Sequence, residues 1–537
     1  MTQVDGTSSD ARSLRRLVVV AVGLLVVGLG VHVAFAREWG ADDAYISFRY
    51  AKNLGDGQGL VFNPGERVEG YTNFLYVLIL TAGATIFHAP HYAVAVSVNV
   101  VALAVVLGMF VRHVDRTIGR DAARWAAAFV VLCPVFYHWV SAGLETPVVL
   151  LLQMLLWLLT ERRVRATPDD PSSDADDAGP RAGDTPPLYV LCAVTVAAVL
   201  IRADGFVFPV VAALYLLVHG RRRDGLTVAT TACLTLAVHV AWRLKYYGYP
   251  LPNTYYTKVS GPLGQRVVHG VGDLAEIGLT ACLLPPVLAI ALAAVAAVRE
   301  ARRRPTSALD LLRALPFETW IAATLLPLWV YVGGDVYEER FLLVVYPAGF
   351  LSLMRVVAPA RWALRTAAAA AFVALQLLVM VRFDYRLWPK YDQFLVLGEF
   401  LRDRYSVNQS LAIDGAGKVP YVTGMPSIDI LGLNDFYLGH KATSFFVVGH
   451  NKYDADYIMR RRPNLIAAWL DMGATVIDLD WGLTKALYDK NGYRVRYVVN
   501  TTAVSNGRDV VDVAGYADPD VRALTLRGYH FAVLERR

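Results

Sequence analysis

The chain has 537 residues, of which 55% are hydrophobic and only 18% charged, and its mean hydropathy is +0.40. This composition is too apolar for an ordinary soluble protein, and it predicts a polytopic membrane protein. The net charge of +6 does not indicate a nucleic-acid partner, because Lys and Arg gather at the ends of apolar runs, as topology signals do.

The first apolar run, residues 17–36, follows three arginines and is long enough to span a bilayer. The positive-inside rule then predicts a cytoplasmic N-terminus, so the adjacent pair Asp42 and Asp43 emerges on the outer face. A carboxylate pair is costly beside hydrocarbon, and here it indicates chemistry at the membrane surface, with one of the two as a catalytic base. The alternative is that Asp42 caps the helix 43–54.

Ten more apolar runs predict the remaining spans, which gives about 11 transmembrane helices in total. The further runs are 93–111, 124–140, 146–160, 188–201, 206–219, 225–243, 278–298, 316–332, 341–355 and 366–381. The run 74–88 is short, and it is interpreted as a juxtamembrane helix of the outer loop 37–92. Leaving it out of the count places each basic connector on the cytoplasmic side.

Composition also divides the chain into domains. The segment 161–187 contains many Pro, Asp and Ser residues and predicts a disordered cytoplasmic loop. After residue 381, short apolar strands alternate with amphipathic stretches, which predicts a small outward-facing α/β domain over 382–537. Residues 1–381 would form the transmembrane catalytic module.

Several polar motifs fall on the predicted outer face, and such convergence suggests a binding site. Lys258, Arg340 and Arg202 are candidates for holding a lipid phosphate, with Tyr255 and Tyr256 beside them. Two alternatives stay open at this point. Arg202 would instead form a local ion pair with the nearby Asp204, and the tyrosine-rich segment 246–258 would instead be an interfacial aromatic belt.

Candidate acceptor contacts lie in two regions of the chain. The C-terminal motifs Leu-Gly-Leu-Asn-Asp and Gly-His-Asn-Lys join turn glycines to side chains that hydrogen-bond sugar hydroxyls. The candidates there are Asn434, Asp435, His450 and Lys452, with structural turns as the alternative. Glu145 either contacts sugar or caps the span that starts at Thr146.

The motifs DDAYISFRYAKNL, GLVFNPGERVEGYTNFL, SAGLE, RADG, YGYPLPNTYYTK, IDILGLND and GHNKYD together carry a family resemblance. The chain resembles the AftB-like arabinofuranosyltransferases of actinobacteria, which are polyprenyl-phosphate-sugar-dependent glycosyltransferases of the GT-C class. The resemblance implies a GT-C fold in a bacterial plasma membrane, followed by a periplasmic domain. It also implies a catalytic carboxylate in the first outer loop, which matches Asp42 and Asp43.

The resemblance further implies a decaprenyl-phosphate arabinose donor and an arabinan acceptor of the cell envelope, in arabinogalactan or lipoarabinomannan. The expected reaction is an inverting single displacement with an Asp base. No metal site is predicted and no cofactor is required, although a divalent cation is compatible with the outer carboxylates. The alternatives are a GT-C transferase of another polyprenyl-phosphate sugar, such as mannose, and a transporter of lipid-linked glycans. Transporters place ionisable groups near mid-bilayer, whereas the predicted spans hold almost no acids.

Overall fold

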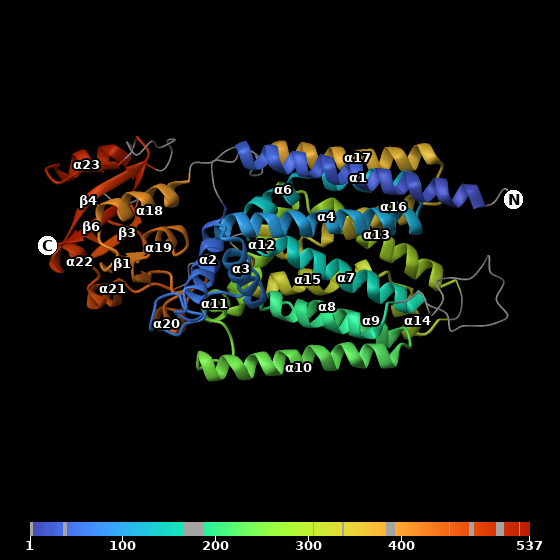
Figure 1. The fold of residues 1–537 in the computed structure, drawn as a ribbon, viewed down its shortest axis with the longest axis horizontal. Helices are drawn as coiled ribbons and strands as arrows, with labels where there is room; N and C mark the ends of the chain where they lie inside the picture. Colours follow the sequence, from blue (N-terminus) through green and yellow to red (C-terminus); the bar gives the residue numbers. More distant parts are fainter. Residues whose placement is uncertain are drawn as a thin grey trace.

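The computed structural model describes residues 4–35, 40–165, 186–303, 306–335, 338–382, 392–449, 452–471, 477–500, 510–525 and 527–537. A bundle of long helices carries a small sheet domain at one end, and the N-terminus lies at the other end (Figure 1). The fold therefore has two distinct ends, and the polar motifs of the sequence meet at the end that carries the sheet.

Most of the bundle helices lie side by side along the long axis of the molecule (Figure 1), whereas the short α14 (Ala308–Ala314) is bent by 97° from α15 (Phe317–Val332). The bundle helices are α1 (Val4–Phe35), α4 (His91–Thr117), α5 (Arg120–Leu132), α6 (Pro134–Ser141), α7 (Thr146–Arg165), α8 (Leu188–Ile201), α9 (Val207–Val218), α10 (Arg222–Tyr246), α12 (Leu263–Thr280), α13 (Leu284–Ala301), α14 (Ala308–Ala314), α15 (Phe317–Val332), α16 (Val345–Val357) and α17 (Trp362–Arg382). Every run predicted as a span overlaps at least one of these helices.

Within the described residues, five helices are long and apolar enough to cross a membrane, or up to seven if each bent pair is one span. The bent pairs are α5 with α6, at 46°, and α14 with α15, at 97°. The prediction of about 11 spans is thus not confirmed by number. Apolar side chains such as Val101, Leu234 and Leu378 are nevertheless exposed on the bundle surface, as lipid-facing residues of a membrane protein are.

Helix boundaries differ from the sequence prediction at several places, among them the break of the run 124–140 between α5 and α6. The run 278–298 splits, because Cys282 adopts a positive φ of 54° and α13 starts only at Leu284, with Pro at its first turn. The amphipathic helix α12, which precedes this break, was not predicted. Helix α7 continues to Arg165, into the segment expected as a loop, and residues 166–185 lie outside the described residues.

The C-terminal domain is an α/β domain with a six-stranded mixed sheet in the order β2-β1-β3-β6-β4-β5. Its strands are β1 (Leu411–Ile413), β2 (Ser427–Asp429), β3 (Leu465–Trp469), β4 (Tyr493–Asn500), β5 (Val510–Asp512) and β6 (Tyr529–Arg536). Strands β1, β2 and β3 pair in parallel, and the pairs β3–β6, β6–β4 and β4–β5 are antiparallel. The helices of this domain are α18 (Gln393–Arg404), α19 (Lys418–Thr423), α20 (Phe436–His440), α21 (Ala455–Arg461), α22 (Lys485–Lys490) and α23 (Asp518–Thr525).

Each face of the sheet has its own apolar core, because successive side chains of a strand point to opposite faces. Leu465 and Ala467 pack with Leu397 and Leu401 of α18, whereas Ile466 packs on the other face. The sheet is thus covered by helices on both faces, and the bundle has a separate core.

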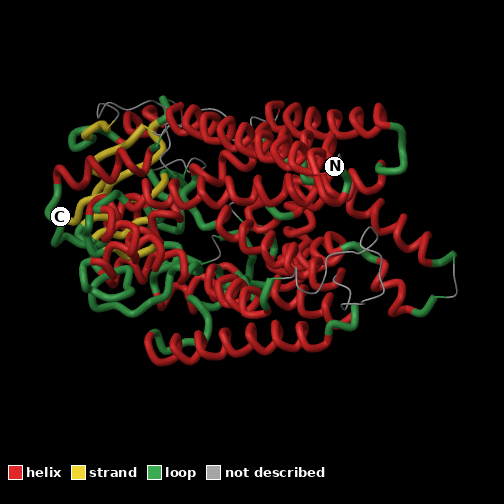
Figure 2. Tube along the Cα trace, turned by 45° about the vertical axis from the view of Figure 1, so that its right-hand side comes forward, coloured by secondary structure: helices red, strands yellow, loops and turns green. Residues whose placement is uncertain are grey.

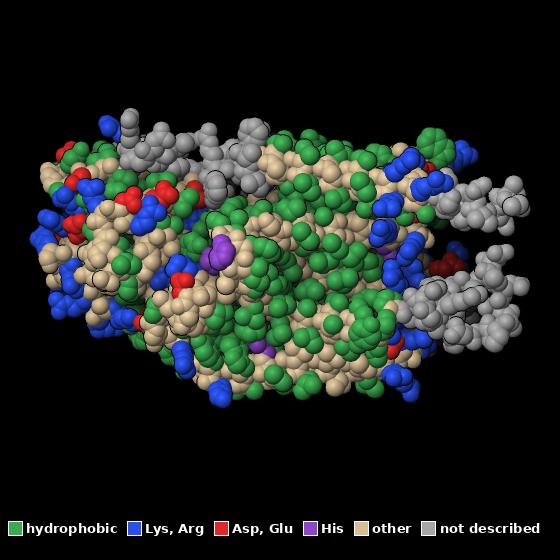
Figure 3. All heavy atoms as spheres, viewed as in Figure 1, with side chains coloured by type: hydrophobic (Ala, Val, Ile, Leu, Met, Phe, Trp, Pro, Cys, Tyr) green, Lys and Arg blue, Asp and Glu red, His purple; other side chains and the backbone are tan. Residues whose placement is uncertain are grey.

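Short helices connect the bundle to the sheet domain. They are α2 (Asp42–Gly55), α3 (Phe74–Phe87), α11 (Asn253–Lys258) and the 3-10 helix η2 (Glu338–Leu342). Helices α2, α3 and α11 lie between the bundle and the strands (Figure 1), and the strands gather at one end of the molecule (Figure 2). The basic side chains at the opposite end form a band (Figure 3), beyond the apolar surface of the bundle.

Candidate functional site

The site is organised by α2, which begins at the Asp pair and is buried along most of its length. The N-cap position of this helix is Ala41, whose side chain makes no capping hydrogen bond, so Asp42 does not cap α2 in the way the sequence suggested. The carboxylate of Asp42 instead accepts hydrogen bonds from the backbone N–H groups of Gly417 and Lys418, at 2.9 and 2.8 Å. Asp42 therefore joins the start of α2 to the start of α19.

The contact around Asp42 is tight. A side chain at Gly417 would collide with the backbone of Asp42. Lys418 is buried, and its Nζ donates to Asp392 at 2.9 Å. Burial raises the pKa of Asp42 to about 6, although Lys418 and the two backbone donors oppose that rise. These features describe a carboxylate that holds two domains together.

Asp43 has a different environment, because neighbouring residues of a helix point about 100° apart. Its Oδ2 lies 3.6 Å from Nζ of Lys258, at the end of α11. Lys258 Nζ also lies 3.4 Å from Oδ1 of Asp335, whose other oxygen accepts from Nε of Arg340 at 2.8 Å. We call Asp43, Lys258, Asp335 and Arg340 the ion-pair chain.

The open end of the ion-pair chain is accessible, and its far end is buried. Asp43 and Lys258 are 25% and 22% exposed, whereas Asp335 and Arg340 are at most 9% exposed. The positive side chains hold the pKa of Asp335 below its usual value against the effect of burial. Asp43 and Lys258 are thus partly open to solvent, and the buried pair lies behind Lys258.

Arg202 lies next to the ion-pair chain through the ring of Phe341. The guanidinium carbons of Arg202 and Arg340 lie 4.2 and 4.7 Å from the centre of that ring. Arg202 also pairs with Asp204, with 2.5 Å between Nε and Oδ1, as the alternative interpretation of the sequence had it. Its Nη1 is buried and has no hydrogen-bond partner among the described residues.

Glu145 belongs to a buried hydrogen-bond network beside α2. Its Oε2 accepts from Nδ2 of Asn73 at 2.8 Å, and Oδ1 of Asn73 accepts from the hydroxyl of Ser47 at 3.0 Å. Glu145 is only 2% exposed. The structure therefore places it behind the site.

The other acceptor candidates hold turns of the sheet domain. Asn434 is buried, and its backbone N–H and Nδ2 donate to Oδ2 of Asp429 at 2.8 and 3.0 Å. Asp435 caps α20 and accepts from the hydroxyl of Tyr457 at 2.8 Å. Nζ of the buried Lys452 donates to the carbonyl of Gly439 at 2.6 Å. His450 lies outside the described residues.

Of the two tyrosines predicted at the donor, Tyr256 contacts the sheet domain. The ring of Tyr256 lies 4.3 Å from that of His440 and 5.9 Å from that of Tyr255. Tyr255 is 39% exposed. Of the predicted donor residues, the structure thus brings Lys258, Arg340 and, through Phe341, Arg202 toward Asp43, whereas Tyr255 and Tyr256 form part of an aromatic surface with His440.

The site predicted from the sequence did not include Phe341, Gly417, Lys418 or Asp392. Asp335 could have been identified from its neighbours in the sequence, because it follows two glycines at the start of a polar segment. Gly417 and Lys418 could not, because their partner Asp42 is about 375 positions away in the chain. Across the described segments, no group of three or more His, Cys, Asp and Glu side chains is arranged to hold a metal ion.

The comparisons with known proteins cover the bundle and the sheet domain. Residues 384–501 match a family described as a domain of unknown function, DUF8728. The fold is similar to that in the crystal structure of ArnT from Cupriavidus metallidurans bound to undecaprenyl phosphate, with a TM-score of 0.51 and 11% sequence identity. The match covers 86% of this chain and 96% of the ArnT chain. ArnT is a GT-C enzyme. The chain has a GT-C fold.

Two curated relatives of this GT-C chain carry the same name. It is 27% identical over 355 residues to the terminal beta-(1->2)-arabinofuranosyltransferase of Mycobacterium tuberculosis. The aligned region is 60% of this chain and 54% of the relative. The chain is 28% identical over 233 residues to the enzyme of that name in Corynebacterium glutamicum, over 42% of this chain and 34% of the relative. The resemblance inferred from the motifs is confirmed, although the chain spans only about a third to a half of these relatives.

Proposed function

We propose that the chain is a membrane glycosyltransferase that moves arabinofuranose from decaprenyl-phosphate arabinose to a cell-envelope arabinan. The name of the two curated relatives supports the sugar, and the fold shared with a polyprenyl-phosphate-bound GT-C enzyme supports a lipid donor. The observation that carries the proposal is the ion-pair chain. It sets an accessible carboxylate, Asp43, beside the cation of Lys258 at the junction of bundle and sheet domain.

The proposed reaction is a single displacement at the anomeric carbon. A hydroxyl oxygen of the acceptor forms the new bond to that carbon, and the bond from the carbon to the phosphate oxygen breaks with its electron pair. Asp43 accepts the proton of the hydroxyl, and polyprenyl phosphate leaves as the anion. Asp43 is a better candidate than Asp42, because both oxygens of Asp42 already accept backbone hydrogen bonds.

The leaving phosphate gains negative charge as its bond to sugar breaks, so cations nearby lower the barrier. Lys258 is the accessible cation next to Asp43, and Arg340 supports it through Asp335. Arg202 adds a guanidinium whose buried Nη1 is unpartnered among the described residues. We assign these three residues to the donor phosphate, with Tyr255 and Tyr256 on the flank that faces the sheet domain.

The proposed orientation puts the site outside the cytoplasm. The basic band lies at the end of the bundle opposite to the sheet domain (Figure 3), which the positive-inside rule assigns to the cytoplasm. Residues 1–381 then form the catalytic module, and residues 382–537 form the outer domain. We assign the acceptor glycan to that domain, with His450 as the candidate contact. The buried Asn434, Asp435 and Lys452 hold turns of the domain, and Glu145 lies behind the site.

A donor-choice assay tests this function. The purified full chain is incubated with an arabinan oligomer and with labelled decaprenyl-phosphate arabinose or polyprenyl-phosphate mannose, and labelled product is measured. We expect label in the oligomer from the arabinose donor alone. Transfer from the mannose donor alone would replace the sugar assignment, and transfer from neither would contradict the proposed reaction.

The anomeric configuration of the product tests the single displacement. One displacement inverts the anomeric carbon, so proton NMR should show product of the opposite configuration to the donor. The same configuration in both would contradict a single displacement. It would require two successive displacements, and Asp43 would then be the first residue to test as the nucleophile.

A further inference from the structure

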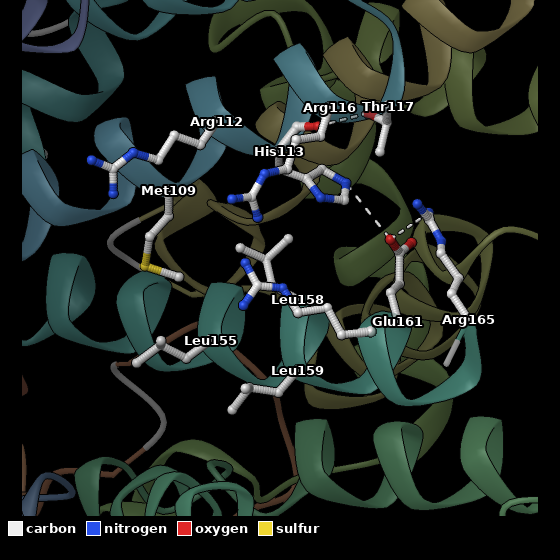
Figure 4. Close-up of a pocket in the computed structure, with 11 residues that line it drawn as sticks. Met109, Arg112, His113, Arg116, Thr117, Leu155, Leu158, Leu159, Glu161 and Arg165 are labelled. Atoms are coloured by element: carbon white, nitrogen blue, oxygen red, sulfur yellow. Dashed lines mark hydrogen bonds and ion pairs between the residues drawn. The ribbon is translucent and has the colours of Figure 1, made fainter. Parts of the chain in front are cut away.

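A cavity lies at the end of the bundle that is remote from Asp43. It has a volume of about 730 Å³ and lies between the last turns of α4 and α7. Arg112, His113 and Arg116 of α4 face Leu155 and Leu159 of α7 across it (Figure 4). None of these residues belongs to the ion-pair chain or to its contacts.

The cavity carries an excess of positive charge. Its only lining carboxylate among the described residues is Glu161, which is already paired with Arg165 at 2.8 Å and with Arg355 at 3.4 Å. The lining residues Arg112, Arg116 and Arg162 have no carboxylate within ion-pair distance in the described part of the chain. Arg116 and Arg162 line the same cavity, and their like charges repel each other. An anion between them would remove this repulsion.

The lining changes character along the helix axis. Met109, Leu155 and Leu158 line the part toward the middle of the bundle, whereas Arg116 and Arg162 lie nearer the helix ends. Leu155 and Arg162 are seven positions apart in one helix, which corresponds to about 10 Å along its axis. A small soluble anion would need only the arginines. An amphiphile with a phosphate head and an acyl chain would use both parts.

The cavity also lies where such an amphiphile would be found. Arg112 and Arg116 lie near the end of α4 and Arg162 near the end of α7. Helix α4 also exposes Val101 and Val105 on the bundle surface. Lipid tails therefore reach α4, and lipid headgroups reach these helix ends. We propose that this cavity binds the phosphate headgroup of an anionic phospholipid, with Arg112, Arg116 and Arg162 as its ligands. The proposal does not depend on the glycosyltransferase function.

Titration of the detergent-solubilised full chain tests the site. Thermal unfolding is followed with increasing short-chain phosphatidylglycerol, with phosphatidylcholine and with inorganic phosphate. We expect saturable stabilisation by phosphatidylglycerol and little by the other two. Each of Arg112→Gln, Arg116→Gln and Arg162→Gln should raise the half-saturating lipid concentration about fivefold. Arg299→Gln is the matched control, because this exposed arginine lies at the end of α13, outside the cavity.

Two outcomes would overturn the proposal. One is an unchanged half-saturating lipid concentration in the triple Arg→Gln variant. The other is equal stabilisation by inorganic phosphate, which would identify a site for soluble anions. Met109→Gln provides a second readout, because it changes the apolar part of the cavity and leaves the charges in place. It should weaken binding of phosphatidylglycerol and leave any weak effect of inorganic phosphate unchanged.

Discussion

At the scale of single residues, the two adjacent aspartates at the start of α2 have different contacts. Asp42 accepts two backbone N–H groups of the sheet domain, and Asp43 lies beside Lys258. The sequence order of the two aspartates does not indicate which contacts each one makes, because these contacts depend on which segment faces each side of α2. The sequence predicted that the two carboxylates belong to a site. In the structure, Asp42 contacts the sheet domain, whereas Asp43 lies beside Lys258 and is partly exposed.

Asp42 should make stability depend on pH. Its pKa is raised from the ordinary value of 3.8 to about 6, so the folded state binds a proton between these values that the unfolded state does not. The free energy of unfolding contributed by this group is therefore highest below about pH 4 and falls as pH rises through 6. Thermal unfolding of the wild type and of Asp42→Asn between pH 5 and 7.5 measures the contribution.

The wild type should lose more stability than Asp42→Asn over that pH range. Asp56→Asn is a suitable control, because Asp56 follows the same helix and is about half exposed beside Lys52. Equal pH slopes for the wild type and Asp42→Asn would show that Asp42 does not change its protonation there.

Lys258 and Arg340 should both be needed for turnover with the lipid donor. Loss of a cation beside the leaving phosphate typically costs about 100-fold in rate, by analogy with other groups that stabilise developing charge. Lys258→Ala and Arg340→Ala should lower kcat by about this factor, measured as released polyprenyl phosphate. Lys52→Ala should have little effect, because Lys52 pairs with Asp56 on the exposed far end of α2. Wild-type turnover in both variants would place the phosphate elsewhere, with Arg202 to be tested next.

At the scale of elements, the apolar helices were predictable, and their packing against the sheet domain was not. Runs of hydrophobic residues showed where the bundle helices lie, and β6 matches the apolar segment 531–534. Helix α12 was missed, because its Gly and charged residues make it amphipathic and not uniformly apolar. The docking of α19 on α2 could not be predicted, because it depends on backbone groups that any sequence would offer.

Close approach at Gly417 should be essential for that docking. A Cβ at this position would collide with the backbone of Asp42, so Gly417→Ala should force the two elements apart. Overpacking of this kind costs about 1–3 kcal/mol, and the thermal midpoint should fall accordingly. Gly515→Ala is the matched control in the same domain, because a Cβ there meets nothing within 4 Å. Equal midpoints for the two variants would show that α19 does not need this close contact.

At the scale of the whole molecule, the proposed orientation places the sheet domain outside the cytoplasm. Gly57 follows α2 in an exposed turn at the sheet-domain end of the bundle, so a cysteine at this position reports the side of the membrane. In intact spheroplasts, Gly57→Cys should react with an impermeant maleimide above the background of the four natural cysteines. Labelling of Gly57→Cys only after the membrane is opened would reverse the proposed orientation.

Asp43 is proposed here as the reacting carboxylate of an arabinofuranosyltransferase. The most direct measurement is transfer of labelled arabinose from decaprenyl-phosphate arabinose to an arabinan oligomer by the purified wild type and Asp43→Asn, with thermal midpoints measured in parallel. The wild type should transfer the sugar. The variant should be slower by about 100-fold to 10,000-fold at an unchanged midpoint, because an amide cannot accept the proton. Full transfer by Asp43→Asn would contradict the role of Asp43 as the reacting carboxylate, and no transfer by a folded wild type would contradict the proposed activity.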